Sequence, residues 1–325
     1  MIGVFDSGLG GLTVLSALTE RFPDLSFVYL GDHAHVPYGN RPSEEIIDLT
    51  RAGVEALFAQ GCKLVVLGCN TATAVAARRL QTAWLPGTRW RAEGHNVVGI
   101  VAPTVEAATQ TPWAVTTPQY PQKFLTDRIA VFGTTRTIAS NVYAEEIRKR
   151  CPRVTVVQQV CAELAGAIEQ GASEAHLEAL VVAGIEAALA QSEGAPPDRA
   201  ILGCTHFPLV EPLFRRHLPA TTRILSQPEV VADSLEDYLS RHPHYRGCVE
   251  AEPRAVVEAE PRAVVEAEPR TVVQAEPRTV VQAEPRVVAQ AEPRVVLLTT
   301  GDTAEASARA RVFAGTTLDF TRLDL

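Results

Sequence analysis

The chain has 325 residues, enough for two domains that each bury a core. Its 46% hydrophobic and 21% charged residues are typical of a globular protein, and no apolar run approaches the roughly 20 residues that span a bilayer. The net charge of −8 argues against a nucleic-acid partner, because such a protein normally has a basic face. The N-terminal stretch "MIGVFDSGLGG" has no signal-peptide pattern, so we do not expect export.

Short apolar runs alternate with longer amphipathic stretches along the whole chain. The amphipathic stretches at 42–60, 137–150 and 230–241 predict helices. This alternation is typical of parallel α/β sheets with crossover helices, in which ligands bind at the carboxyl ends of the strands. The runs that predict strands are "IGVF", "SFVYL", "KLVVL", "NVVGIV", "RIAVF", "TVVQQV", "RAIL", "TRIL" and "VVLLT".

The first predicted strand ends in a glycine-rich turn, "FDSGLGGLTVL". Together with Asp32 at the end of the next strand, this turn is similar to a dinucleotide-binding turn, but Thr13 stands where the third glycine belongs. Two interpretations follow. The turn could hold a nicotinamide cofactor, or it could let Asp6, Ser7 and backbone N–H groups reach a cleft and hold a carboxylate.

Two later strands each end in a cysteine followed by polar residues. "LGCNTATA" contains Cys69 and "LGCTHFPL" contains Cys204. A lone cysteine at a strand end is usually a small buried hydrophobic residue, but each of these two would lie near a helix N-terminus that favours the thiolate. Two matched thiols suggest an acid and a base on opposite faces of one carbon, and inversion of a stereocentre as the result. Their polar neighbours are Asn70, Thr71, Thr205 and His206.

A weak internal repeat relates the two halves of the chain. "IGVFDSGLGGLTVLS" resembles "IAVFGTTRTIAS", and the two cysteine motifs resemble each other at a similar offset. We therefore expect two pseudo-symmetric parallel-sheet α/β domains that face each other across an active-site cleft. Beside a thiol, and matched by Asp6 in the other half, His206 is predicted to assist proton transfer.

The residues that bind common cofactors and metals are scarce or badly spaced. The only lysines are Lys63, Lys123 and Lys149, and none follows a strand, so we expect no pyridoxal phosphate bound through a lysine. The six cysteines form no CxxC pair and are interpreted as free thiols. His33 and His35 have no third ligand at a recognisable spacing and are interpreted as loop residues, so we expect no metal.

Two segments interrupt the α/β pattern. Residues 110–123 are rich in proline and threonine and predict a surface loop. At about 250–296 the tetrapeptide AEPR recurs every eight residues. A proline in each copy would break a helix and weaken a central strand, so we expect this block to loop out and to be dispensable for catalysis. An ordered stack of β-rich repeats is the alternative.

These motifs together resemble the glutamate racemase family, within the aspartate/glutamate racemase superfamily. The matching stretches are "GVFDSGLGGLTVL", "GDHAHVPYG", "LGCNTATA", "GTTRTIAS", "LGCTHFPLV" and, near the C-terminus, "LTTGD". The resemblance implies cofactor-independent interconversion of L- and D-glutamate, which supplies D-glutamate for peptidoglycan. It also implies a second domain inserted into the first, so that 1–97 plus 207–325 surround 98–206. We expect a cytoplasmic homodimer.

The resemblance also implies roles for individual residues. Cys69 and Cys204 would be the two proton donors and acceptors, assisted by Asp6 and His206. Asp32 and Glu169 align with acidic residues that support the site, although the stretch around Glu169, "VCAELAGAIEQG", lacks the proline that the family usually has after its cysteine. The substrate would be bound by Asp6, Ser7, Tyr38, Gly39, Asn70, Thr71, Thr134, Thr205 and His206.

Three other functions remain open from the sequence. The chain could act on another small acid such as aspartate, although the histidine after "CT" fits the glutamate enzymes. It could be a nicotinamide-dependent oxidoreductase. It could also be a non-catalytic binding protein that works through its repeat, a possibility that the two cysteine motifs argue against.

Overall fold

The computed structural model describes residues 1–246 and 294–325. The octapeptide block therefore lies outside the described residues, except for its last residues from Arg294 on. No helix in the described ranges is long and apolar enough to cross a membrane.

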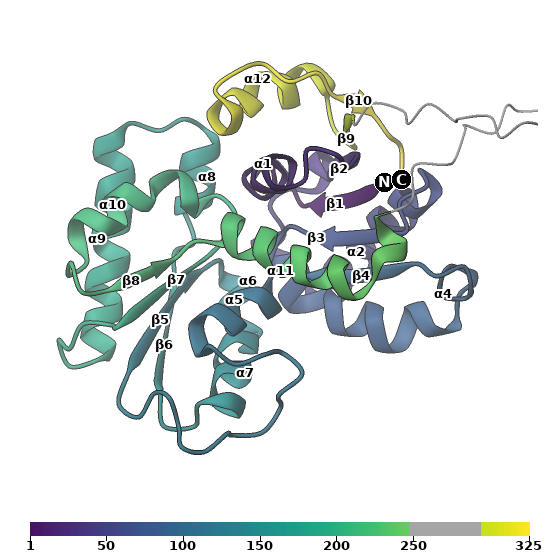
Figure 1. Cartoon of the computed structure of the whole chain (residues 1–325). Helices are drawn as coiled ribbons and strands as arrows, with labels where there is room; N and C mark the ends of the chain where they lie inside the picture. Colours follow the sequence, from purple (N-terminus) through teal and green to yellow (C-terminus); the bar gives the residue numbers. More distant parts are fainter. Residues whose placement is uncertain (247–293) are drawn as a thin grey trace, which may run out of the picture.

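Two parallel sheets organise the molecule (Figure 1). The first sheet has the strand order β10-β9-β2-β1-β3-β4 and the second has the order β6-β5-β7-β8, with every pairing parallel. The predicted fold of two parallel-sheet α/β units is thus confirmed. The strands are β1 (Ile2–Asp6), β2 (Phe27–Gly31), β3 (Leu64–Leu67), β4 (Asn96–Gly99), β5 (Arg128–Gly133), β6 (Thr155–Val160), β7 (Arg199–Gly203), β8 (Arg223–Leu225), β9 (Val295–Thr299) and β10 (Thr321–Arg322).

Helices connect the strands and cover the faces of both sheets (Figure 1). Several begin at a side chain that caps the first turn: Thr134 accepts from the N–H of Thr137, and Asp302 accepts from that of Glu305. The helices are α1 (Leu12–Arg21), α2 (Ser43–Ala59), α3 (Asn70–Ala72), α4 (Arg89–Ala92), α5 (Val101–Thr109), α6 (Thr135–Ala139), α7 (Val142–Arg150), α8 (Leu164–Glu169), α9 (Glu174–Gln191), α10 (Glu211–His217), α11 (Gln227–Arg241) and α12 (Thr303–Ala314).

The predicted elements differ from the observed ones in two places. The helix expected over 137–150 is interrupted at Asn141, whose φ of 59° lies in the left-handed region, so that α6 ends and α7 begins there. The two-residue strand β10 was not predicted, because it is too short to show an alternating pattern. Residues 110–123 contain no helix or strand, which agrees with the predicted loop.

The chain passes between the two sheets twice. It leaves the first sheet between β4 and α5, and it returns after β8 through α11, which packs against α1 and α5. β8 (Arg223–Leu225) pairs with β7 in the second sheet, so this sheet includes residues beyond 206, the end expected for the second domain. Both faces of each sheet are covered by buried apolar side chains, which fixes the strands firmly enough to position residues at their carboxyl ends.

Candidate active site

The two cysteines lie where the sequence predicted, directly after β3 and β7. Cys69 is the N-cap of α3, and its Sγ lies 3.4 Å from the N–H of Ala72 and 3.4 Å from the hydroxyl of Ser7. The Sγ of Cys204 lies 3.7 Å from Nδ1 of His206. Both thiols are buried, each 5% exposed. Cys69 thus follows β3 of the first sheet, and Cys204 follows β7 of the second sheet.

Hydrogen bonds join the loops that carry the thiols across the boundary between the two sheets. Thr205 donates to Oδ2 of Asp6 at 3.3 Å, and the hydroxyl of Thr13 donates to the backbone oxygen of Thr205 at 3.1 Å. A further contact between the two sheets is made by the hydroxyls of Thr71, after β3, and Thr134, after β5, which lie 2.9 Å apart. The structure thus brings together residues from both halves of the sequence around the two cysteines.

The glycines of the first loop allow this close approach. A Cβ on Gly10 would collide with the hydroxyl of Thr205, and a Cβ on Gly11 would stand 2.6 Å from the Cβ of Asp6. Asp6 itself is fully buried and accepts a hydrogen bond from the N–H of Gly8 at 2.8 Å. Close contact with the second half of the chain thus accounts for Gly10, and close packing against Asp6 accounts for Gly11. Burial raises the pKa of Asp6, although the neighbouring His206 opposes the shift.

Burial is also the main influence on the pKa of the Cys69 thiol. It raises the pKa of this thiol to about 12, and the charge of Asp6 adds to the effect, while the N–H of Ala72 and the hydroxyl of Ser7 oppose it. The sequence suggested that a helix N-terminus would favour the thiolate, but desolvation outweighs that contribution here. At neutral pH Cys69 is therefore a protonated acid in the free protein.

The surroundings of Cys204 are different, because His206 and Glu169 lie behind it. Nε2 of His206 is 3.6 Å from Oε2 of Glu169, a distance that fits an ion pair but is too long for a hydrogen bond. Burial alone would lower the pKa of His206, but Cys204 and Glu169 together raise it to about 10. Burial opposes the ionisation of Glu169, yet His206 keeps the pKa of this carboxyl below its usual value. An imidazolium beside Cys204 stabilises negative charge on that sulfur.

Asp32 supports the loop that carries Tyr38 and Gly39. It is fully buried, and it accepts hydrogen bonds from the hydroxyl of Tyr38 at 2.7 Å and from that of Thr300 at 2.6 Å. Nδ1 of His35 lies 2.8 Å from the same carboxylate. Gly39 faces the second half of the chain, where a Cβ would stand 3.1 Å from the Cβ of Thr134. Asp32 therefore holds this loop in place.

Sequence reasoning missed the partner of Asn70. The side-chain amides of Asn70 and Gln227 bond to each other in both directions, and the hydroxyl of Tyr143 donates to Oδ1 of Asn70 at 2.7 Å. Nε2 of Gln227 also donates to Thr104, at 3.2 Å. Gln227 is the first residue of α11, where the chain returns to the first sheet, and Thr104 lies in α5, where the chain leaves it. The network therefore links Asn70 to both segments that connect the two sheets. No sequence pattern could reveal a pairing between residues so far apart.

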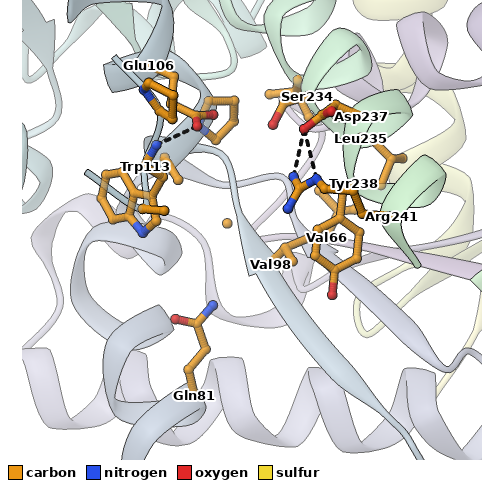
Figure 2. Close-up of a pocket in the computed structure, with 16 residues that line it drawn as sticks. Val66, Gln81, Val98, Glu106, Trp113, Ser234, Leu235, Asp237, Tyr238 and Arg241 are labelled. Carbon is orange, nitrogen blue, oxygen red and sulfur yellow. Dashed lines mark hydrogen bonds and ion pairs between the residues drawn. The ribbon is translucent and has the colours of Figure 1, made fainter. Parts of the chain in front are cut away.

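A mainly apolar cavity lies elsewhere in the described part of the chain. A space of about 540 Å³ opens between α5, α11 and the loop that carries Trp113, and none of the predicted site residues lines it. Figure 2 shows the ion pair between Asp237 and Arg241 on one side and Glu106, which accepts from the N–H of Trp113, on the other. The described residues contain no cluster of three or more metal-ligating side chains. The polar site around the thiols is therefore the better candidate for chemistry.

Comparisons with known proteins show the family of the chain. The model of the Asp/Glu/hydantoin racemase family matches residues 13–233. A glutamate racemase from Phenylobacterium zucineum is 53% identical over 247 residues, which cover 75% of this chain and 87% of that protein. A second one, from Paracoccus denitrificans, is 48% identical over 246 residues, which cover 76% and 87%.

Solved structures show the same fold. The crystal structure of a glutamate racemase isoform from Bacillus anthracis has a TM-score of 0.71 at 25% identity and covers 100% of this chain and 97% of that one. A glutamate racemase from Francisella tularensis, crystallised in complex with D-glutamate, has a TM-score of 0.71 at 20% identity, with coverage of 100% and 96%.

The fold, with a buried thiol after a strand of each sheet, is that of an amino-acid racemase, a kind of isomerase. Given the family match and the close relatives, the chain belongs to the Asp/Glu/hydantoin racemase family and, within it, to the glutamate racemases.

Proposed function

We propose that the chain interconverts L- and D-glutamate without a cofactor, with Cys69 and Cys204 as the two proton-transfer groups. The observation that supports this most strongly is the placement of the thiols. Each is buried at the carboxyl end of a strand in a different sheet, and they lie near enough that Cys204 contributes to the raised pKa of Cys69.

In the proposed reaction one thiolate removes the α-hydrogen of glutamate while the other thiol delivers a proton to the opposite face of the same carbon. Asp6 and His206 assist, because each is buried within reach of a cysteine loop. Hydroxyl, amide and backbone N–H groups around the thiols would bind the two carboxylates and the ammonium group of the substrate. We assign this role to Ser7, Tyr38, Gly39, Asn70, Thr71, Thr134 and Thr205, with Asp32 and Glu169 as supporting residues.

Incubating the purified protein with L-glutamate in D₂O tests this function. We expect deuterium to enter the α-position as optical rotation is lost, with no cofactor added, because the mechanism exchanges the α-hydrogen through the thiols. Polarimetry and NMR follow the two processes together. A protein that leaves L-glutamate unchanged until pyridoxal phosphate or a nicotinamide is supplied would contradict the proposal.

Further properties belong to the same proposal. The product D-glutamate would serve peptidoglycan synthesis in the cytoplasm, and the enzyme would work as a homodimer. We also propose two domains, the second inserted into the first. The pairing of β8 with β7 supports placing the second boundary after β8, at the start of α11, rather than at residue 206.

Replacing residues 251–294 with a short Gly/Ser linker is expected to leave kcat/KM within a few-fold of the parent. The segment rejoins the fold at the start of β9, where the backbone oxygen of Arg294 accepts from Phe27. Phe27 begins β2, so this junction lies at the opposite end of the sheet from Asp32 and the thiols. Loop-closure entropy also changes little with length. A loss of several orders of magnitude in a still-folded variant would show that the block contributes to the site or to a required dimer.

A further inference from the structure

The buried amide network around Asn70 reaches from one cysteine loop to the other. Asn70 directly follows Cys69, and its side chain accepts a hydrogen bond from the hydroxyl of Tyr143. The ring of Tyr143 packs against the residue before the second thiol, since a Cβ on Gly203 would stand 3.5 Å from its Cε2. Burial raises the pKa of Tyr143, and the charge of Cys204 adds to the rise. The network is therefore close to both proposed proton-transfer groups.

Thr104 determines which way the two amides of this network face. Its hydroxyl lies 2.7 Å from the backbone oxygen of Ile100, and because a carbonyl oxygen only accepts, Thr104 donates its single hydrogen there. Toward Gln227, 3.2 Å away, the same hydroxyl can then only accept, so the amide atom that faces it must be the nitrogen Nε2. This turns Oε1 of Gln227 toward Asn70, where it accepts from Nδ2.

The network leaves Asn70 with a donor and no free acceptor. Its Oδ1 accepts from Nε2 of Gln227 at 2.7 Å and from the hydroxyl of Tyr143 at 2.7 Å, which occupies both lone pairs. Nδ2 has two hydrogens, and Gln227 accepts one of them, whereas the described residues offer no acceptor to the other. Asn70 is only 2% exposed, so an unpaired N–H there is costly until a ligand accepts it.

The backbone beside Cys69 is held by other hydrogen bonds. The hydroxyl of Thr73 donates to the backbone oxygen of Leu67 at 3.0 Å, and the N–H of Thr73 donates to that of Cys69 at 2.9 Å. The side-chain amide of Gln227 bonds only to other side chains. Loss of this amide should therefore free the side chain of Asn70 and leave Cys69 in place.

We propose that Gln227 is a positioning residue for substrate binding: it holds the amide of Asn70 so that Nδ2 donates to a carboxylate of glutamate. The inference rests on the proposed function, in which Asn70 binds the substrate. Without Gln227, the Asn70 amide can turn over and present Oδ1, which repels a carboxylate.

Gln227→Met removes the amide at nearly the same side-chain length. We expect KM for glutamate to rise about ten-fold, the loss typical of one hydrogen bond to a charged group, with kcat within about three-fold of the parent. The bound carboxylate is charged before and during proton transfer, so the ground state and the transition state lose the same bond. Polarimetry over a range of glutamate concentrations separates KM from kcat.

Tyr238→Phe is the matched control. Tyr238 also lies in α11, and its hydroxyl accepts from Nδ2 of Asn96 in β4 at 2.8 Å, so this variant removes another hydrogen bond between the same helix and the first sheet. It should keep the parent kcat and KM. A parent KM in Gln227→Met, or an equal rise of KM in Tyr238→Phe, would overturn the proposal.

The Asn70→Ala background tests whether Gln227 acts through Asn70. Adding Gln227→Met there should raise KM no further, because the amide that it orients is gone, and a further ten-fold rise would overturn the proposal. If thermal melting shows that Gln227→Met does not fold, Tyr143→Phe decides. This variant removes one donor to Oδ1 and should raise KM about three-fold in the parent and not at all in Asn70→Ala, and any other result would overturn the proposal.

Binding measurements separate this inference from the proposed function. Calorimetry with D-glutamate gives a Kd for each variant, and we expect the same ten-fold weakening in Gln227→Met as in KM. A parent that binds D-glutamate but does not racemise it would contradict the proposed function, and the Kd values would then decide the role of Gln227 by the same criteria. A parent that binds neither enantiomer would contradict both.

Discussion

Cys69→Ala and Cys204→Ala are each expected to lower racemisation by at least about 10³-fold, because one turnover needs a base on one face of the α-carbon and an acid on the other. The two enantiomers have equal free energy, so kcat/KM must fall by the same factor in both directions. Polarimetry that starts from L-glutamate and from D-glutamate measures both losses.

The remaining cysteines provide the controls. Cys62, Cys151 and Cys161 are buried in apolar clusters and follow neither β3 nor β7, and their replacement by alanine or serine should cost stability at most. Cys248 lies outside the described residues, and we expect its replacement to be tolerated as well. Full activity in Cys204→Ala would rule out the two-thiol mechanism.

His206→Asn is expected to lower kcat/KM about 100-fold, because the imidazolium that stabilises charge on Cys204 is removed while the thiol remains. His217→Asn is a suitable control, since His217 is a half-exposed histidine that also pairs with a glutamate, Glu178, at 2.7 Å. That variant should keep the parent activity. A His206→Asn enzyme as active as the parent would show that Cys204 needs no charged neighbour.

The same variant should also change how stability depends on pH. The pKa of His206 is raised from 6.5 to about 10, so its stabilising effect is complete below pH 6.5 and is lost as the pH rises toward 10. The pKa of Glu169 is lowered from 4.5, so its contribution is present above pH 4.5 and is lost as the pH falls.

The parent should therefore exceed His206→Asn most in free energy of unfolding between pH 4.5 and 6.5, on the order of 2–3 kcal/mol, and least above pH 10. Urea denaturation at pH 6, 8 and 10 measures the difference. A difference that stays constant across this range would show that the ion pair does not form.

The sequence predicted the sheet strands and the cysteine positions well because both depend on local patterns. Runs such as "KLVVL" and "RAIL" are apolar because strands of a parallel sheet are buried on both faces, and a polar residue after such a run marks its carboxyl end. The end of the second sheet at β8 and the break in the helix at Asn141 depend on packing and on a single backbone conformation, which the pattern does not contain.

The energetics of the site could not be predicted in the same way. The helix-start position of Cys69 suggested a favoured thiolate, but the pKa depends on the desolvation that the folded domains impose together. The bond between Asn70 and Gln227 and the tight contact between Gly10 and Thr205 join residues from distant parts of the chain. Only the assembled structure shows that these side chains meet.

The two thiols have unequal surroundings, so the two protonation forms of the free enzyme differ in free energy, although the reaction itself is symmetric. If the thiols exchange roles as proposed, each turnover leaves the acid and the base interchanged, and the protein must restore its proton before it can accept the same enantiomer again. The His206 imidazolium lies beside Cys204, whereas burial raises the pKa of Cys69 to about 12. The proton return that follows turnover in one direction is therefore favourable in free energy, and the return that follows turnover in the other direction is unfavourable. At saturating substrate this recycling limits the two maximal rates differently, while the ratio of the two kcat/KM values stays at unity.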